Sequence, residues 1–294
     1  MALVDHEGVE AVAIAVPPRL QSEIAVRALA LRKPVFVEKP LAADLADAAV
    51  MLEQANASRL PAVIDFEFPE IMAWRRAKEF LDSGAIGRLR HVVVTWNVEN
   101  AATRLRLKSW KSSRAAGGGV LGNFVCHCFH YLEWFGGPLQ GLSARLFGLP
   151  DGERDEESTV ALAFAFESGA GGSLAMSCAS YAGSGHRLEF YGDDGTLMLI
   201  NEGPDYMRGF TLTYARRPAA LAQVPVEDRL DHRFADGRVA PVARLAARFV
   251  DAIEGGPPAT PSFADGYRVQ QLMEAARRSH DLKCWVGVSP EVPT

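Results

Sequence analysis

The sequence predicts a fold of the α/β + α+β type, in which a partial Rossmann-like parallel sheet precedes a domain with a large, mostly antiparallel, open sheet and helices. Three observations support this prediction. Short, wholly apolar runs alternate with helical periodicity in the first quarter of the chain; alternating strands follow; two helical stretches come last. At about 150 residues per domain, the 294 residues accommodate two domains. We place the boundary between them at 67/68, giving domains 1–67 and 68–294.

The first domain reads as β-α-β-α-β. Continuous apolar runs at 11–16 and 34–37 are typical of strands buried on both faces of a parallel sheet, and we expect a third strand at 62–68. Residues 21–31 and 44–57 carry apolar side chains at helical spacing, and Asp44 is a suitable N-cap for the second helix. We expect right-handed crossovers between these strands.

The second domain begins with a helix that we expect to run from Pro69 to about residue 83. A strand with alternating apolar side chains at 88–98 and a helix at 117–135 follow. Turn residues then separate four further strands, as in hairpins. We predict those strands at 160–166, 173–177, 187–191 and 196–200, and the two last helices at 242–254 and 265–279.

Composition excludes several classes of protein. The chain carries 31 basic and 36 acidic residues without a basic block, which argues against nucleic acids and anionic membranes as partners. No apolar run approaches the length of a transmembrane helix. The first ten residues are acidic and lack the features of a signal peptide, so we expect a cytoplasmic protein.

The four cysteines do not form a disulfide framework in a chain of this size. Cys126-His127-Cys128 resembles a metal-binding fragment but has no second pair of ligands nearby, so we interpret it as buried thiols on a helix and expect no metal site. Glu133, three residues beyond His130, keeps a metal as the alternative.

The first candidate site is Glu38-Lys39-Pro40, at the carboxyl end of a predicted buried strand. Open α/β sheets bind their ligands at this edge. A poorly solvated lysine there can have its pKa lowered toward neutrality and can act as an acid or base. The alternative is an ordinary surface lysine after a strand.

The second candidate site lies in the helix that follows three glycines at 117–119. Asn123, His127 and His130 are spaced to share one helix face. A histidine can transfer a proton near neutral pH, and an asparagine can orient a hydroxyl group. The glycines permit close backbone approach at the helix start. His130 is equally well explained as a core residue.

With these residues in view, the chain resembles the glucose–fructose oxidoreductase / inositol dehydrogenase (Gfo/Idh/MocA) family over essentially its whole length. Six features occur in the family's order. They are VPP at 16–18, KPVFVEKPL at 33–41, SGAIG at 83–87, the triple glycine with His127, GDDGTL at 192–197 and PSFADG at 261–266.

The resemblance implies an oxidoreductase that moves hydride between NAD or NADP and a hydroxyl-bearing carbon of a sugar- or cyclitol-like, polyhydroxylated substrate. Lys39 and His127 match the family's catalytic lysine and histidine. The family also implies a homo-oligomer formed through the C-terminal sheet. By the same resemblance and their nearness in sequence, we assign Asn123, His130 and Trp110 to the substrate, and Pro17, Pro18, Glu38, Lys39 and Pro40 to the cofactor.

Three positions depart from the family pattern. Asn123 stands where the family usually has aspartate, so it can hydrogen-bond a hydroxyl group but carries no charge. His130 stands where aspartate is frequent, and Gln21 stands where a histidine often follows the two prolines.

A Rossmann domain normally opens with a strand, a Gly-x-Gly-x-x-Gly turn and a helix. Residues 117–122 fit this pattern by letter, but polar residues 111–114 precede them instead of a buried strand. We therefore expect the first part of the Rossmann domain to be lacking. A late start of the sequence, natural shortening, or completion of the sheet by a partner chain would each explain it.

Two classes of function follow. The chain is a sugar- or cyclitol-type dehydrogenase that uses Lys39 and His127, or it is a non-catalytic binding or assembly protein derived from this family. Binding of NADH or NADPH would discriminate between them.

Overall fold

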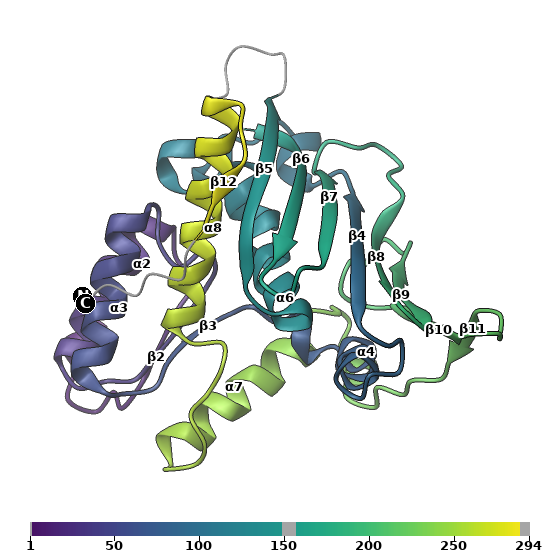
Figure 1. Ribbon diagram of the computed structural model, residues 1–294. Helices are drawn as coiled ribbons and strands as arrows, with labels where there is room; N and C mark the ends of the chain where they lie inside the picture. Colours follow the sequence, from purple (N-terminus) through teal and green to yellow (C-terminus); the bar gives the residue numbers. More distant parts are fainter. Residues whose placement is uncertain (1, 149–156, 289–294) are drawn as a thin grey trace.

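The computed structural model describes residues 2–148 and 157–288, which form two sheets. A three-stranded parallel sheet has the order β1-β2-β3, and a nine-stranded sheet has the order β11-β10-β9-β8-β4-β7-β6-β5-β12. The helix α8 stands between them (Figure 1). The predicted fold class is thereby confirmed, whereas the boundary at 67/68 stays a prediction.

The small sheet follows the predicted order of elements. Its strands pair in parallel, with Val12 opposite Val35 and Val35 opposite Ala62. The Asp44 side chain accepts a hydrogen bond from the Asp47 amide, as expected of an N-cap. The elements are α1 (Ala2–Asp5), β1 (Val12–Ile14), α2 (Pro18–Ala30), β2 (Val35–Val37), α3 (Leu45–Ser58) and β3 (Ala62–Ile64).

Both faces of the small sheet are covered, which explains its apolar runs. Val35 and Val37 of β2 are fully buried in the main core together with side chains of α2 and α3. On the opposite face, the Phe36 ring packs edge-on against Phe249 of α7 (Val239–Ile253), with ring centroids 5.8 Å apart. The small sheet is therefore a buried layer despite its three short strands.

The large sheet is antiparallel except for the central pair β4–β7. Alternate side chains of each strand face the helices, as Val92, Val94 and Trp96 of β4 do, and these are buried. Its strands are β4 (Leu89–Asn97), β5 (Leu139–Gly148), β6 (Glu157–Phe166), β7 (Gly171–Ser177), β8 (Gly185–Gly192), β9 (Gly195–Asn201), β10 (Thr211–Arg216), β11 (Ala222–Val224) and β12 (Val286–Gly287).

The helix α8 (Phe263–Leu282) connects the two layers. Its Ser279 hydroxyl accepts a hydrogen bond from the Ala144 amide of β5, and Arg268 binds Glu133 of α6 (Cys126–Gly136). The same helix packs on α3 and β3. Within residues 2–148 and 157–288, no helix is long and apolar enough to cross a membrane. The other helical segments are η1 (Phe68–Glu70), α4 (Met72–Asp82), α5 (Ala101–Arg104), η2 (Trp110–Ser112), η3 (Arg114–Ala116), η4 (Leu121–Val125) and η5 (Asp231–Arg233).

Two predicted boundaries between the sheets are wrong. The third strand ends at Ile64 instead of 68, and Pro69 lies in a 3₁₀ turn, so α4 begins at Met72. The reason is the buried Phe68 side chain, whose ring lies 4.9 Å from Trp74 and 5.4 Å from Trp96. Packing Phe68 into this aromatic cluster directs the chain away from the small sheet, so residues 65–67 connect β3 to the large domain.

Glu70 binds the two layers together. Its buried carboxylate pairs with Arg75 of α4 and Arg248 of α7, and its backbone oxygen accepts a hydrogen bond from Arg244 at 2.8 Å. The helix that covers one face of the small sheet is thus tied to the segment that begins the large domain.

Replacing Glu70 by alanine should lower the free energy of unfolding by about 1–3 kcal/mol, because a buried charged acceptor is lost between two helices. Urea titration measures the change. Arg27→Ala is the matched control, because it removes the exposed Arg27–Asp5 pair and should cost less than about 1 kcal/mol. Equal effects of the two variants would contradict this role for Glu70.

Candidate active site

A cavity of about 980 Å³ lies where the carboxyl ends of β1 and β2 face the large sheet. The small sheet contributes the segments just after its strands, and the large domain contributes β4, the start of α6 and two loops. This is the edge at which open α/β sheets bind ligands. Its lining includes Pro17, Glu38, Lys39, Asp65, Glu67, Trp110, Asn123, His127, Tyr206, Asp236 and Arg238.

Lys39 is positioned by a buried amide that sequence reasoning assigned no role. The Gln21 side chain of α2 donates hydrogen bonds to the backbone oxygens of Glu38, Pro40 and Leu41, at 2.6, 3.1 and 3.0 Å. These bonds hold the turn that carries Lys39. The Lys39 ammonium crosses the cavity and donates to the Asn123 backbone oxygen at 2.9 Å, which links the small sheet to the helix of the second candidate site.

The predicted lowering of the Lys39 pKa is wrong. Burial does oppose the charged ammonium, but the ionisable groups around it, Cys126, Glu67 and Glu38 in order of effect, outweigh that cost and raise the pKa of Lys39. Lys39 is therefore a permanent cation at neutral pH. It can donate a hydrogen bond and stabilise negative charge, but it does not serve as a base.

The helix with His127 begins irregularly. Gly122 packs against the Gly117 carbonyl so closely that a Cβ atom would lie 1.8 Å from its oxygen, and residues 121–125 form a π turn before α6. The close approach predicted for these glycines is thus observed, and the glycines follow a 3₁₀ turn, not a buried strand. π turns are frequent at functional sites, and this one sets the relative position of Asn123 and His127.

The backbone binds the amide nitrogen of the Asn123 side chain but not its oxygen. Its side-chain amide donates to the carbonyl oxygens of Lys111 and Gly119, at 3.0 and 2.9 Å. Its Oδ1 atom is buried without a hydrogen-bond partner in the structure. Asn123 therefore offers one hydrogen-bond acceptor at the cavity and carries no charge.

His127 is buried against aromatic rings. Phe66 and Phe68 meet its ring edge-on at centroid distances of 5.8 and 5.2 Å. Burial first, and then the positive charge of Lys39, place the pKa of His127 well below its usual value. The imidazole is therefore neutral at physiological pH.

Two carboxyl groups that the sequence reasoning missed lie beside His127. Asp65 and Glu67 follow β3 and line the cavity, and Glu67 Oε2 lies 3.6 Å from His127 Nδ1. Burial raises the pKa of Glu67 to about 7, and burial together with the neighbouring Glu67 raises the pKa of Asp65 well above its usual range. The protonation of Glu67 can therefore change near neutral pH, and the surroundings of Asp65 favour its protonated form.

Not every residue predicted for the site reaches the cavity. Lys39, His127, Asn123, Trp110, Pro17 and Glu38 line it. Pro18 and Pro40 lie outside the lining, where Pro18 begins α2 and Pro40 belongs to the turn held by Gln21. His130 stacks on Phe66 at 4.6 Å outside the lining, and burial lowers its pKa to about 4. This environment fits the core alternative for His130.

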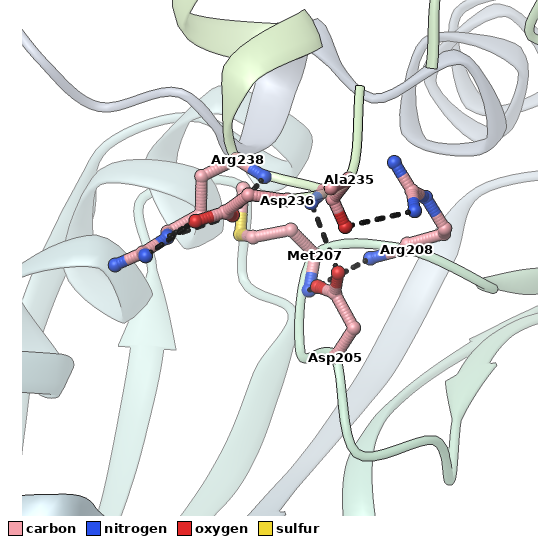
Figure 2. A network of polar contacts seen from close by, with 7 residues as sticks. Asp205, Met207, Arg208, Ala235, Asp236 and Arg238 are labelled. Atoms are coloured by element: carbon pink, nitrogen blue, oxygen red, sulfur yellow. Dashed lines mark hydrogen bonds and ion pairs between the residues drawn. The ribbon is translucent and has the colours of Figure 1, made fainter. Parts of the chain in front are cut away.

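Two loops of the large domain complete the cavity wall. Asp205 accepts hydrogen bonds from the amides of Met207, Arg208 and Gly237, and so joins the loop after β9 to the segment before α7 (Figure 2). Arg238 pairs with Asp236 in that second segment. Tyr206 and Arg238 are thereby fixed at the cavity, although no sequence motif marked them.

The cysteine–histidine fragment is used within the helix. Cys126 Sγ donates to the Gly122 carbonyl at 3.0 Å, and Cys128 accepts from the Tyr131 hydroxyl at 3.0 Å. Glu133 is bound by Arg268. Among the residues that the structure describes, no group of three or more histidine, cysteine or acidic side chains is arranged to hold a metal ion.

Replacing Gln21 by alanine should lower the free energy of unfolding by about 1–3 kcal/mol, because buried carbonyl oxygens of the 38–41 turn lose their donor. Hydrogen exchange should accelerate at the amides of this turn. Arg19→Ala, at an exposed position of the same helix, should change neither quantity. An unchanged exchange rate in the Gln21 variant would contradict the positioning role.

The chain is similar to known oxidoreductases over most of its length. Residues 1–66 match the family model described as "Oxidoreductase family, NAD-binding Rossmann fold", and residues 74–198 match the GFO/IDH/MocA C-terminal domain. An uncharacterized oxidoreductase of Synechocystis sp. is 32% identical over 97% of this chain and 81% of its own length. Levoglucosan dehydrogenase of Pseudarthrobacter phenanthrenivorans is 25% identical over 98% of this chain and 82% of its own length.

The fold agrees with these matches. A solved structure of levoglucosan dehydrogenase in complex with NADH and levoglucosan superimposes with a TM-score of 0.86, at 23% identity, over 98% of this chain and 82% of that chain. The two family models together cover the small sheet and β4 to β8 of the large sheet. The Synechocystis relative is similar over nearly the whole sequence. The chain therefore belongs to the Gfo/Idh/MocA family of oxidoreductases.

Proposed function

We propose that this oxidoreductase transfers hydride between NAD or NADP and a hydroxyl-bearing carbon of a polyhydroxylated substrate, a sugar or cyclitol. One observation carries the proposal: Lys39, from the small sheet, meets the Asn123–His127 helix segment inside a single cavity. The similarity to levoglucosan dehydrogenase over 98% of the chain supports a sugar-like substrate.

The cofactor fits the edge of the cavity formed by the small sheet. Pro17 and Glu38 line it directly after β1 and β2, and Lys39 extends from the same edge toward the helix. Carboxyl ends of parallel strands are the usual nucleotide-binding edge. When bound there, NAD(P) supplies the acceptor or donor of hydride. Pro18 and Pro40 act indirectly, by shaping the segments that follow the two strands.

The side chains of this chain supply binding and electrostatics. The permanently charged Lys39 donates to the reacting oxygen and stabilises the negative charge that develops on it. The free acceptor of Asn123 and the guanidinium of Arg238 suit further hydroxyl groups, and the Trp110 ring offers an apolar face for the C–H groups of a sugar ring. His127 stands beside the reacting oxygen as the proton-transfer group.

The first test is binding. The 294-residue chain is titrated with NADH and NADPH and followed by fluorescence or calorimetry. Micromolar binding supports the proposal, whereas no binding favours the alternative of a non-catalytic binding or assembly protein. Oxidation of a panel of sugars and cyclitols then identifies the substrate.

Lys39→Met should lower turnover about 10²–10⁴-fold, because the donor to the reacting oxygen is removed. His127→Asn should have an effect of the same order. Lys78→Met is the control, because Lys78 lies on α4 and pairs with Asp82 outside the cavity. Wild-type turnover in the first two variants would refute the assigned roles.

We also propose a homo-oligomer formed through the face of the large sheet that points away from the helices. Ala161 and Ala163 of β6 and Ser173 and Ala175 of β7 are exposed there, so a flat surface of small side chains is offered to a second copy.

A cytoplasmic location agrees with the cysteines, because all four lie in the described residues and none forms a disulfide.

Ala163→Arg should reduce the oligomer to monomers, because a long charged side chain then stands at the centre of the flat face. Size-exclusion chromatography with light scattering measures the mass, and circular dichroism checks that the fold is kept. A wild-type chain that already runs as a monomer would contradict the proposed interface.

A further inference from the structure

The cavity holds a charge arrangement that leaves the reaction's proton without an obvious acceptor. Lys39 stays protonated, and Asn123 carries no ionisable group at the position where the family usually has aspartate. His127 is neutral and resists a second proton. An alcohol that is oxidised must nevertheless give up its hydroxyl proton to some group of the chain.

Asp65 and Glu67 are the acidic groups placed to receive that proton. Both side chains are buried, at 5% and 7% exposure, and both line the cavity together with His127. Glu67 Oε2 lies 3.6 Å from His127 Nδ1, and neither that nitrogen nor Asp65 Oδ1 has a hydrogen-bond partner in the structure. Small adjustments would close the contact between the imidazole and Glu67 when substrate binds.

We propose that Glu67 accepts the substrate's proton through His127, and that Asp65 is a second proton-accepting carboxyl group at the same site. Glu67 takes over the charge that Asn123 lacks, from the end of β3 instead of from the helix. The proposal rests on the oxidoreductase function proposed above and names a residue for its proton step.

In the oxidative direction the substrate O–H bond breaks and its proton binds His127 Nε2, while the Nδ1 proton passes to the Glu67 carboxylate. The carbonyl forms as the carbon-bound hydrogen leaves with its electron pair for the oxidised NAD(P) of the proposed reaction. His127 ends as the other neutral tautomer, and Glu67 ends as a carboxylic acid. Reduction runs through the same bonds in reverse.

The surroundings tune Glu67 for this task. Burial favours its neutral form, and Glu38 adds to this effect, while its own backbone amide, Lys39 and Arg238 favour the carboxylate. The balance leaves the pKa of Glu67 at about 7, where a group can both accept and release a proton. The other ionisable groups near Glu67 include Asp65, His127, Cys126 and Tyr206.

The decisive variants are Glu67→Gln and Asp65→Asn, which keep size and hydrogen bonding but remove titration. Without any cofactor or substrate, infrared spectra of the wild type between pH 5 and 9 should show the band of a protonated carboxyl disappearing with a midpoint of about 7. Glu67→Gln should lack this transition. The stability of the wild type should fall as pH rises from about 5 to about 7 and then level off, because a carboxyl whose pKa is raised to about 7 in the fold is harder to ionise there than in the unfolded chain. Glu67→Gln should make that slope shallower, and the raised pKa of Asp65 accounts for the slope that remains.

Glu53→Gln is the matched control, because Glu53 is an exposed carboxylate of α3 outside the cavity lining. It should leave the infrared transition and the pH profile of turnover unchanged. In Glu67→Gln, kcat for oxidation should fall at least tenfold with little change in KM, and its rise through pH 7 should disappear.

The outcomes separate this inference from the function on which it rests. If a carboxyl group of the wild type titrates near pH 7 but the protein oxidises no sugar or cyclitol, the proposed function is refuted. The assignment of Glu67 as a proton-accepting carboxyl group is then still supported. An active wild type whose pH profile and infrared transition survive in Glu67→Gln overturns the inference and leaves the function standing.

Discussion

The chemistry of the site depends on one buried ammonium group. Lys39 crosses from the small sheet to the helix of the large domain and donates to the Asn123 carbonyl. A cation in this position requires nearby negative charge, which Glu38 and Glu67 supply. Burial keeps His127 neutral, and the charge of Lys39 adds to this effect. The protonation states of the surrounding groups therefore depend on their burial and on where Lys39 is held.

Holding Lys39 in place is the task of the small sheet. β2 ends where the Gln21 amide, from α2, binds the backbone oxygens of the next turn, so the lysine leaves the sheet in a fixed direction. The sheet in turn packs between α2 and α8 on one side and α7 on the other. Glu70 then ties α7 to the large domain. Positioning at the site is thus a consequence of how the two layers are joined.

Much of this arrangement could be predicted from the sequence, because apolar runs and helical spacing are local signals. The parallel sheet, the N-cap at Asp44 and the candidates Lys39 and His127 came from such signals. The sign of the Lys39 pKa shift did not, because it depends on carboxylates brought in by other elements. Asp65 and Glu67 were missed because they were assigned to the third strand. Their position after a buried strand, the same as that of Lys39, was the available signal.

The departure at Asn123 acquires a physical meaning in this setting. Replacing an aspartate by asparagine removes a negative charge from beside an ammonium group, and a cation that lost its counter-charge in a buried site would be costly. Here the site keeps carboxylates on the opposite wall, at the ends of β2 and β3, where they face the same ammonium. The amide at 123 is then free to bind the Lys111 and Gly119 carbonyls and fix the π turn that precedes His127. The wall formed by the small sheet therefore supplies the negative charge, and the wall with Asn123 sets the geometry of the helix. A change at Asn123 alone should disturb the shape of the helix start more than the charge of the site.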